Sequence, residues 1–167
     1  FRKVRHIGPK SHRLVRVCSI AVKGALFHPL QDGRHAKKRE GQIEAKIRDL
    51  GDAQIEDALI PLAIAATDIC SGEQVVFRSG SVADAVCASV AVPGLFAPVE
   101  IQGRKLVDGG IIENVPVSLL RQMRAGIIIA INLSGKGSYA TPKSTADSFS
   151  NAIDICIDHK TKQQLKQ

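Results

Sequence analysis

Hydrophobic residues along the chain form short apolar runs separated by stretches with helical spacing, and this pattern predicts strands interleaved with helices. Residues 62–67 and 127–131 are apolar runs of strand length in which hydrophobic and polar residues do not alternate. Because a strand covered on both faces has this pattern, we expect both segments to be buried strands. Shorter strands are predicted at residues 75–77, 99–101 and 105–107, and the last two flank a turn.

Helix signals occupy the segments between these strands. Ser81 followed by Asp84 resembles a capping box, and a helix rich in alanine is predicted to follow it. Asn114 is placed to cap a later helix that ends at Gly126. The apolar face of that helix comprises Leu119, Leu120 and Met123. Strands that alternate with helices indicate an α/β layered fold.

Helical spacing also marks both ends of the chain. Phe149, Ile153 and Cys156 lie at positions i, i+4 and i+7, which predicts a C-terminal helix with these residues on its apolar face. The pattern becomes polar from His159 onward. Two N-terminal helices are predicted, over residues 13–26 and 43–50.

Composition and charge narrow the possible partners. With 167 residues, 44% of them hydrophobic and 23% charged, the chain is predicted to form one folded domain. The net charge of +7 is uneven, because residues 1–48 carry 13 Lys and Arg against 3 Asp and Glu. Such a basic segment forms a solvated face or contacts an anionic membrane surface. Nucleic acid is not expected, because the segment lacks interleaved aromatic residues for base stacking.

The cysteines and histidines suggest neither a metal site nor a redox site. The four cysteines form no C-x-x-C pair, so we interpret them as buried free thiols in a reducing compartment: Cys18, Cys70, Cys87 and Cys156. All five histidines lie in polar or basic surroundings and are expected at the surface. With no secretory signal and no apolar run of the ~18 residues that a spanning helix needs, a cytoplasmic location is expected, with peripheral membrane contact through the basic segment.

The sharpest local feature is a carboxylate followed by two glycines at the end of a predicted strand, Asp108-Gly109-Gly110. Glycine permits positive φ and the close approach of another chain segment to the carboxylate. Taken alone, an Asp-Gly pair is also typical of a plain tight turn. Local sequence therefore leaves a functional carboxylate and a turn as alternatives.

A longer series of ordered motifs resembles the patatin-like phospholipase family, in its bacterial branch of small serine hydrolases. The residues that carry the resemblance are Ile60 to Asp68, Ser71-Gly72, Val76 to Gly80, Ala88-Ser89, Pro93 to Val99, Leu106 to Gly110 and Asn114 to Val117. They follow one another in register within a match from about Lys23 to Leu133, which makes the resemblance far more specific than the Asp-Gly-Gly motif by itself.

The resemblance implies a three-layer α/β/α sandwich that hydrolyses acyl esters of lipids with a Ser-Asp dyad. It implies that Asp108 is the catalytic aspartate and that Gly109 and Gly110 complete the motif. The family uses no metal ion and no organic cofactor, so neither is expected. Its substrates imply a lipid or another acyl ester as the partner of this chain.

The nucleophile that the resemblance implies is absent from the 167 residues. In the family, an oxyanion glycine loop and a G-x-S-x-G nucleophile elbow come earlier in the chain, and this sequence contains neither. We therefore expect residues 1–167 to be the C-terminal portion of one patatin-like hydrolase domain that lacks its N-terminal strands, and to be inactive alone. The alternative is a non-catalytic binding module that contacts anionic lipid or a protein partner.

Overall fold

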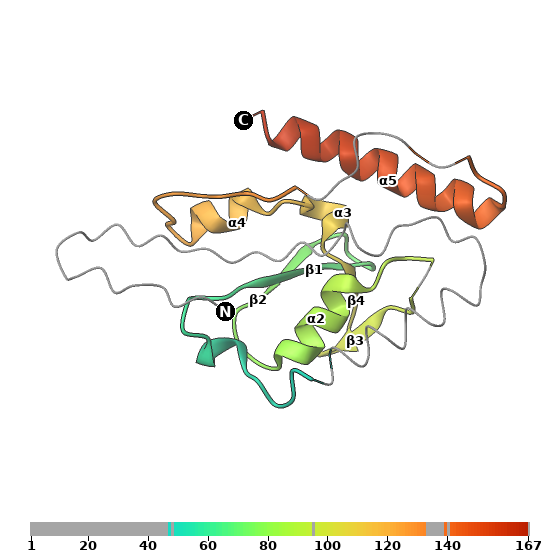
Figure 1. Cartoon of the computed structure of the whole chain (residues 1–167). Coiled ribbons are helices and arrows are strands. Elements are labelled where there is room, and N and C mark those ends of the chain that lie inside the picture. The colour runs from blue at the N-terminus through green and yellow to red at the C-terminus, as the bar shows by residue number, and fades with distance from the viewer. Residues whose placement is uncertain (1–46, 48, 95, 133–138, 140, 167) are drawn as a thin grey trace.

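The computed structural model describes residues 47, 49–94, 96–132, 139 and 141–166, and these form a mixed α/β structure around a four-stranded sheet (Figure 1). The strands are β1 (Ile64–Asp68), β2 (Gln74–Phe77), β3 (Val99–Ile101) and β4 (Arg104–Asp108). The helices are the short 3-10 helix η1 (Ile55–Asp57), α2 (Val82–Val90), α3 (Gly110–Glu113), α4 (Val117–Gln122) and α5 (Thr145–Gln164). The predicted α/β class is confirmed, while the predicted helix over residues 13–26 lies outside the described residues, as does most of that over 43–50.

The sheet has the order β2-β1-β4-β3, and every neighbouring pair is antiparallel. The hairpin between β3 and β4 turns at Gln102 and Gly103, both with positive φ, as the predicted turn requires. In the centre of the sheet, Ala66 of β1 lies opposite Asp108 of β4. The register therefore brings the Asp-Gly-Gly motif alongside the first half of β1.

Helix α2 covers one face of the sheet, where it packs against β1 and β4 (Figure 1). Its predicted capping box is confirmed, because the Ser81 side chain accepts a hydrogen bond from the Asp84 amide at 3.1 Å. Small residues face the sheet: Ala88 packs with Ala66, and both are fully buried. Alanine at these two positions lets the helix backbone approach the strand closely, which sets the distance between the two layers.

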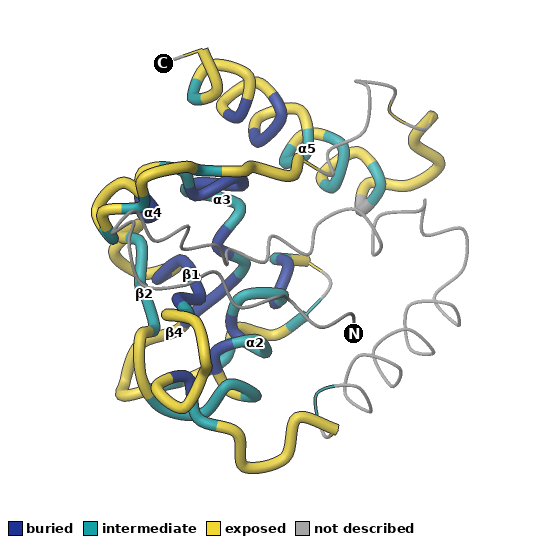
Figure 2. Tube along the Cα trace, turned by 60° about the vertical axis from the view of Figure 1, so that its left-hand side comes forward, coloured by how far each residue is buried: buried dark blue, intermediate teal, exposed yellow. Residues whose placement is uncertain are grey.

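The prediction of a buried strand at residues 127–131 is wrong. In Figure 2 the segment after α4 is largely exposed, and the side chains of Ile127, Ile129 and Ile131 are 59%, 62% and 70% exposed. A strand needs a neighbour for its backbone N–H and C=O groups. Among the described residues, no strand pairs with this segment, so it takes an irregular course.

The helix after the Asp-Gly-Gly motif also differs from its prediction. Asn114 does not cap α4 but follows the last residue of α3, and Pro116 stands at the N-cap of α4. The helix ends at Gln122, before the predicted Gly126, because Arg124 takes a positive φ of 58° and reverses the chain. Its predicted apolar face is confirmed by the burial of Leu119 and Leu120, and Met123 is half-buried.

Helix α5 forms where it was predicted, but a different face of it is buried. Phe149 and Cys156 are exposed, whereas the buried residues are Ile157, Asp158 and Thr161. The contact of α5 with α3 selects this face (Figure 1). Burial of the free thiols is also a wrong prediction: Cys70 and Cys156 are exposed and Cys87 is half-buried, while Cys18 lies outside the described residues.

Candidate active site around Asp108

Asp108 is the last residue of β4, and its backbone is held on both sides. Its N–H donates to the Ala91 carbonyl at 3.0 Å, and its carbonyl accepts a hydrogen bond from the Thr67 hydroxyl at 3.0 Å. Ala91 is the C-cap of α2 and Thr67 belongs to β1, and both are buried. The strand end that carries the carboxylate is therefore tied both to the helix layer and to the central strand of the sheet.

The carboxylate of Asp108 is oriented by the helix that begins just after it. The Gly110 amide donates to Oδ1 of Asp108 at 2.8 Å. Because this donor is the first residue of α3, the junction between strand and helix fixes the side chain. The chain leaves β4 into a helix and not into a hairpin.

The two glycines are needed for close approach and not for an unusual backbone conformation. Gly109 has φ −64° and ψ −22°, and Gly110 begins a right-handed helix, so neither residue uses the positive φ that glycine permits. Close approach is confirmed, because a Cβ on Gly109 would lie 2.4 Å from the Ala65 carbonyl oxygen. A Cβ on Gly110 would lie 3.1 Å from Oδ1 of Asp108. Gly109 thus permits the junction to pack on β1, and Gly110 leaves room for the carboxylate.

Two buried polar side chains near the motif were not predicted to take part in the site. Asn114 is 4% exposed, and its Oδ1 lies 3.3 Å from the position that a Cβ on Gly110 would occupy. Its amide group therefore lies on the same side of the motif as the carboxylate of Asp108. Glu113 is also buried, and its carboxylate accepts hydrogen bonds from the Ser118 amide at 2.9 Å and from the Ser118 hydroxyl. Glu113 thus accepts a hydrogen bond from a backbone amide in the first turn of α4 that has no partner within the helix, and this contact joins α3 to α4.

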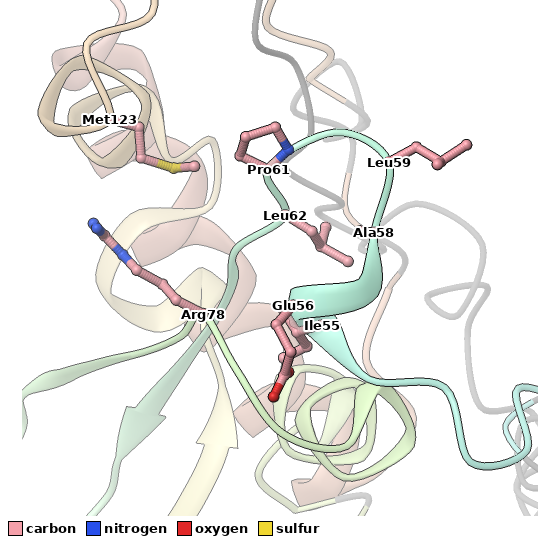
Figure 3. Close-up of a pocket in the computed structure, with 8 residues that line it drawn as sticks. All are labelled: Ile55, Glu56, Ala58, Leu59, Pro61, Leu62, Arg78 and Met123. Carbon is pink, nitrogen blue, oxygen red and sulfur yellow. The ribbon is translucent and has the colours of Figure 1, made fainter.

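A pocket of about 500 Å³ opens at the end of the sheet where β1 begins (Figure 3). Its walls come from the segment that leads from η1 into β1, from the end of β2 and from the C-terminus of α4. Most of its lining residues are apolar, and the charged ones are Glu56 and Arg78. No feature of the local sequence had singled out this pocket, because its walls come from segments far apart in the chain.

The remaining candidates stay apart from Asp108. His159 is exposed on α5, as predicted, and the other four histidines lie outside the described residues. Ser89 lies within α2. Among the residues that the structure describes, no group of three His, Cys, Asp or Glu side chains could hold a metal ion. The helices in this part of the chain are all too short or too polar to cross a bilayer.

A family model described as patatin-like phospholipase matches residues 22–121, which is more than half of the chain and includes Asp108, Gly109 and Gly110. The chain belongs to the patatin-like phospholipase family. It is 38% identical over 110 residues to an uncharacterized NTE family protein of Mycobacterium tuberculosis, covering 65% of this chain and 30% of that protein. It is also 31% identical over 102 residues to the lysophospholipase NTE1 of Yarrowia lipolytica, covering 61% of this chain and 7% of that protein.

A second fungal protein, the lysophospholipase nte1 of Emericella nidulans, is 34% identical over 108 residues, or 65% of this chain and 7% of its own length. This chain therefore spans less than a third of the length of each of these relatives.

Proposed function

We propose that this chain supplies the aspartate of a Ser-Asp dyad in a lipid acyl hydrolase, and that the serine lies in a G-x-S-x-G segment outside these 167 residues. Residues 1–167 would then be the C-terminal portion of one hydrolase domain, and the four-stranded sheet a part of a three-layer α/β/α sandwich. The observation that carries the proposal is the fixed Asp108 carboxylate, which ends a strand within the segment matched by the family model.

In the proposed reaction, Asp108 acts as the general base. The serine hydroxyl attacks the carbonyl carbon of the acyl ester while Asp108 takes its proton, and a tetrahedral intermediate forms. The carbon–oxygen bond to the leaving alcohol then breaks, and the proton passes from Asp108 to that alcohol. Water attacks the acyl-enzyme with Asp108 again as the base, which releases the fatty acid and restores the serine.

The anchoring of Asp108 supports this role because a base must be positioned before its proton transfer is effective. Its backbone hydrogen bonds to Ala91 and Thr67 and its side-chain bond from Gly110 limit its movement at three points. General acid–base catalysis by a positioned group contributes roughly 10²–10⁴-fold to a rate. Loss of the base with retention of shape should therefore reduce turnover strongly and leave the fold intact.

The test compares Asp108→Asn with Asp49→Asn in a form of the protein that contains an upstream G-x-S-x-G. Asp49 is an exposed turn residue, so its variant controls for the loss of one negative charge. We expect Asp108→Asn to lower kcat by roughly 10³-fold, within the range of about 10²–10⁴-fold that a positioned general base contributes. Asp49→Asn should hydrolyse p-nitrophenyl esters at the wild-type rate. Retention of more than about a tenth of kcat by Asp108→Asn would refute the dyad.

The second candidate function is a binding module without catalysis, which the absence of G-x-S-x-G from the 167 residues favours. In that case the basic segment, residues 1–48, would contact anionic lipid or a protein partner; nearly all of it lies outside the described residues. A fluorophosphonate label discriminates between the two functions, because it reacts with an activated serine. Labelling of the longer form at its G-x-S-x-G serine supports the hydrolase, and no labelling supports the binding module.

A further inference from the structure

The pocket at the beginning of β1 combines an apolar wall with a positive charge, that of Arg78. Pro61, Leu62 and Met123 form the wall around the side chain of Arg78, whose guanidinium group extends toward Met123 (Figure 3). Among the described residues, Arg78 forms no ion pair and no hydrogen bond through its side chain. A volume of about 500 Å³ lies within the range of roughly 300–1,000 Å³ that is typical of small-molecule sites.

The other charged residue of the pocket does not neutralise Arg78. The Glu56 carboxylate accepts a hydrogen bond from the Gly80 amide at 2.7 Å, and in Figure 3 it points away from the guanidinium group. Hydrogen bonds from backbone amides hold the pKa of Glu56 below its usual value, so this carboxylate stays ionised and turned toward Gly80.

Two more arginines stand close to Met123 in the sequence. Arg121 and Arg124 are exposed and flank Met123 in the sequence at the C-terminus of α4. Arginine presents a planar fork of N–H donors that matches the oxygens of a phosphate or a carboxylate. An apolar wall beside such a fork suits a molecule that is anionic at one end and hydrocarbon at the other.

We infer that this pocket binds an anionic amphiphile, with Arg78 contacting its phosphate or carboxylate group and the wall of Leu62, Pro61 and Met123 holding its hydrocarbon. This class of ligand includes phosphate-bearing lipids with one chain and free fatty acids. The inference concerns binding at this pocket alone, and it holds whether or not Asp108 is a catalytic base.

The register of the sheet separates this pocket from Asp108. Arg78 follows the Ile64–Phe77 pair by one position, whereas Asp108 lies opposite Ala66 on the other side of β1. Three residues along the strands and two strand spacings across them place the two Cα atoms roughly 14 Å apart. The pocket is therefore a second site and not a part of the dyad.

The single methionine of the sequence provides a direct probe of binding. Met123 is that residue and lies in the wall of the pocket, so a sample labelled with ¹³C-methyl methionine reports on the site through its own methyl signal. We would titrate the 167-residue chain with dodecyl phosphate, dodecanoate or neutral dodecyl maltoside, each kept below its micelle concentration. The Met123 signal should shift and saturate with both anionic probes. The tighter of the two identifies the natural head group as a phosphate or a carboxylate.

Matched charge variants test the role of Arg78. Arg78→Gln should weaken binding of the anionic probes by about tenfold or more, because hydrogen bonds to charged groups contribute roughly 1.5–3 kcal/mol. Arg104→Gln removes the same charge at the far end of β4 and should change the affinity by less than about twofold. Arg78→Lys should retain part of the affinity through its charge. Both arginines are exposed, so the variants should melt at the wild-type temperature.

Three outcomes would overturn the inference. Dodecyl maltoside that shifts the Met123 signal as strongly as dodecyl phosphate would show that the charge of Arg78 takes no part in binding. Equal affinities in Arg78→Gln and Arg104→Gln would place the anion elsewhere. No shift of the Met123 signal with either anionic probe would show that the pocket does not bind this class of ligand. Because none of these readings depends on turnover, they remain distinct from a failure of the dyad.

Discussion

Replacing Gly109 by alanine tests whether the Asp-Gly-Gly motif is packed against β1 as the structure indicates. The new Cβ would lie 2.4 Å from the carbonyl oxygen and 2.8 Å from the carbonyl carbon of Ala65. Ordinary van der Waals contact begins at 3.4 Å, so the two backbones must separate by roughly 1 Å. Both belong to paired strands or their immediate continuation, and no flexible side chain can move to relieve the contact.

The magnitude follows from two opposing effects. Overpacking in a well-packed site costs about 1–3 kcal/mol, and sometimes more. Because the φ and ψ of Gly109 suit alanine, the lower entropy of the unfolded chain offsets about 0.4–1 kcal/mol of this cost. Because the new Cβ meets backbone atoms, the overpacking cost lies in the upper part of its range, at about 2–3 kcal/mol, and we expect a net loss of roughly 1–2.5 kcal/mol in the free energy of unfolding. For a chain of this size, that lowers Tm by about 2–10 °C.

Gly110→Ala is the matched control for this experiment. The atoms nearest to its Cβ would belong to side chains, Oδ1 of Asp108 at 3.1 Å and Oδ1 of Asn114 at 3.3 Å, and side chains can shift by a few tenths of an ångström. We expect its free energy of unfolding to stay within about 1 kcal/mol of the wild-type value. Thermal unfolding followed by circular dichroism measures both variants. A Gly109→Ala chain that melts at the wild-type temperature, or above Gly110→Ala, would refute the reasoning.

Three further predictions concern the helices around the motif. Glu113→Ala should lower the free energy of unfolding by about 1–3 kcal/mol, because it leaves two donors of Ser118 without their acceptor. Glu113→Gln should lower it by less, and equal urea midpoints for the two variants would contradict this. Ser144→Ala should cost about 1 kcal/mol through loss of the N-cap of α5, whereas Ser144→Asp should retain the cap; unchanged stability of the alanine variant would refute it. Burial, together with the hydrogen bond to Asp158, raises the pKa of Tyr139, so its contribution to stability is complete below pH 10 and is lost as the pH rises through the folded pKa. As the only tyrosine of the chain, Tyr139 can be titrated by its absorbance, and a midpoint at or below 10 would contradict the prediction.

The elements that were predicted correctly carry their determinants in neighbouring residues. The Ser81 side chain caps α2 by accepting a hydrogen bond from an amide only three residues later in the sequence. The turn at Gln102-Gly103 by itself brings β3 and β4 together. The apolar run that predicts β1 also lies within a single segment of the sequence. The strand is buried in the structure, where α2 covers one of its faces. Sequence patterns therefore predicted the sheet well wherever adjacent segments pair or pack.

The incorrect predictions depend on contacts between distant segments. An apolar run such as residues 127–131 has the same pattern whether or not another strand pairs with it, so its composition cannot determine its pairing. In α5, the spacing of Phe149 and Cys156 is helical, but the contact with α3 decides which face is buried. Helical periodicity identifies the helix and leaves the choice of face to its neighbours.

The same distinction applies to the candidate site. Asp108 was predicted from its motif and from a family resemblance, whereas the partners of its backbone were not. Thr67 lies 41 residues earlier and donates to its carbonyl, and only the register of β1 with β4 brings the two together. Arg78 was missed for a similar reason, because its pocket is assembled from η1, β2 and α4.

The hydrogen bond from the Asp108 amide to Ala91 links the strand end that carries the carboxylate to the centre of the described fold. Ala91 closes α2, and that helix covers the two central strands of the sheet. This amide can exchange with solvent deuterium only when the last turn of α2 separates from the end of β4. Fluctuations at the outer strands β2 and β3 can therefore occur while the carboxylate stays in place. Displacement of the Asp108 backbone requires an opening of the central unit, so the deuterium exchange rate at this one amide measures how long the end of β4 remains in position.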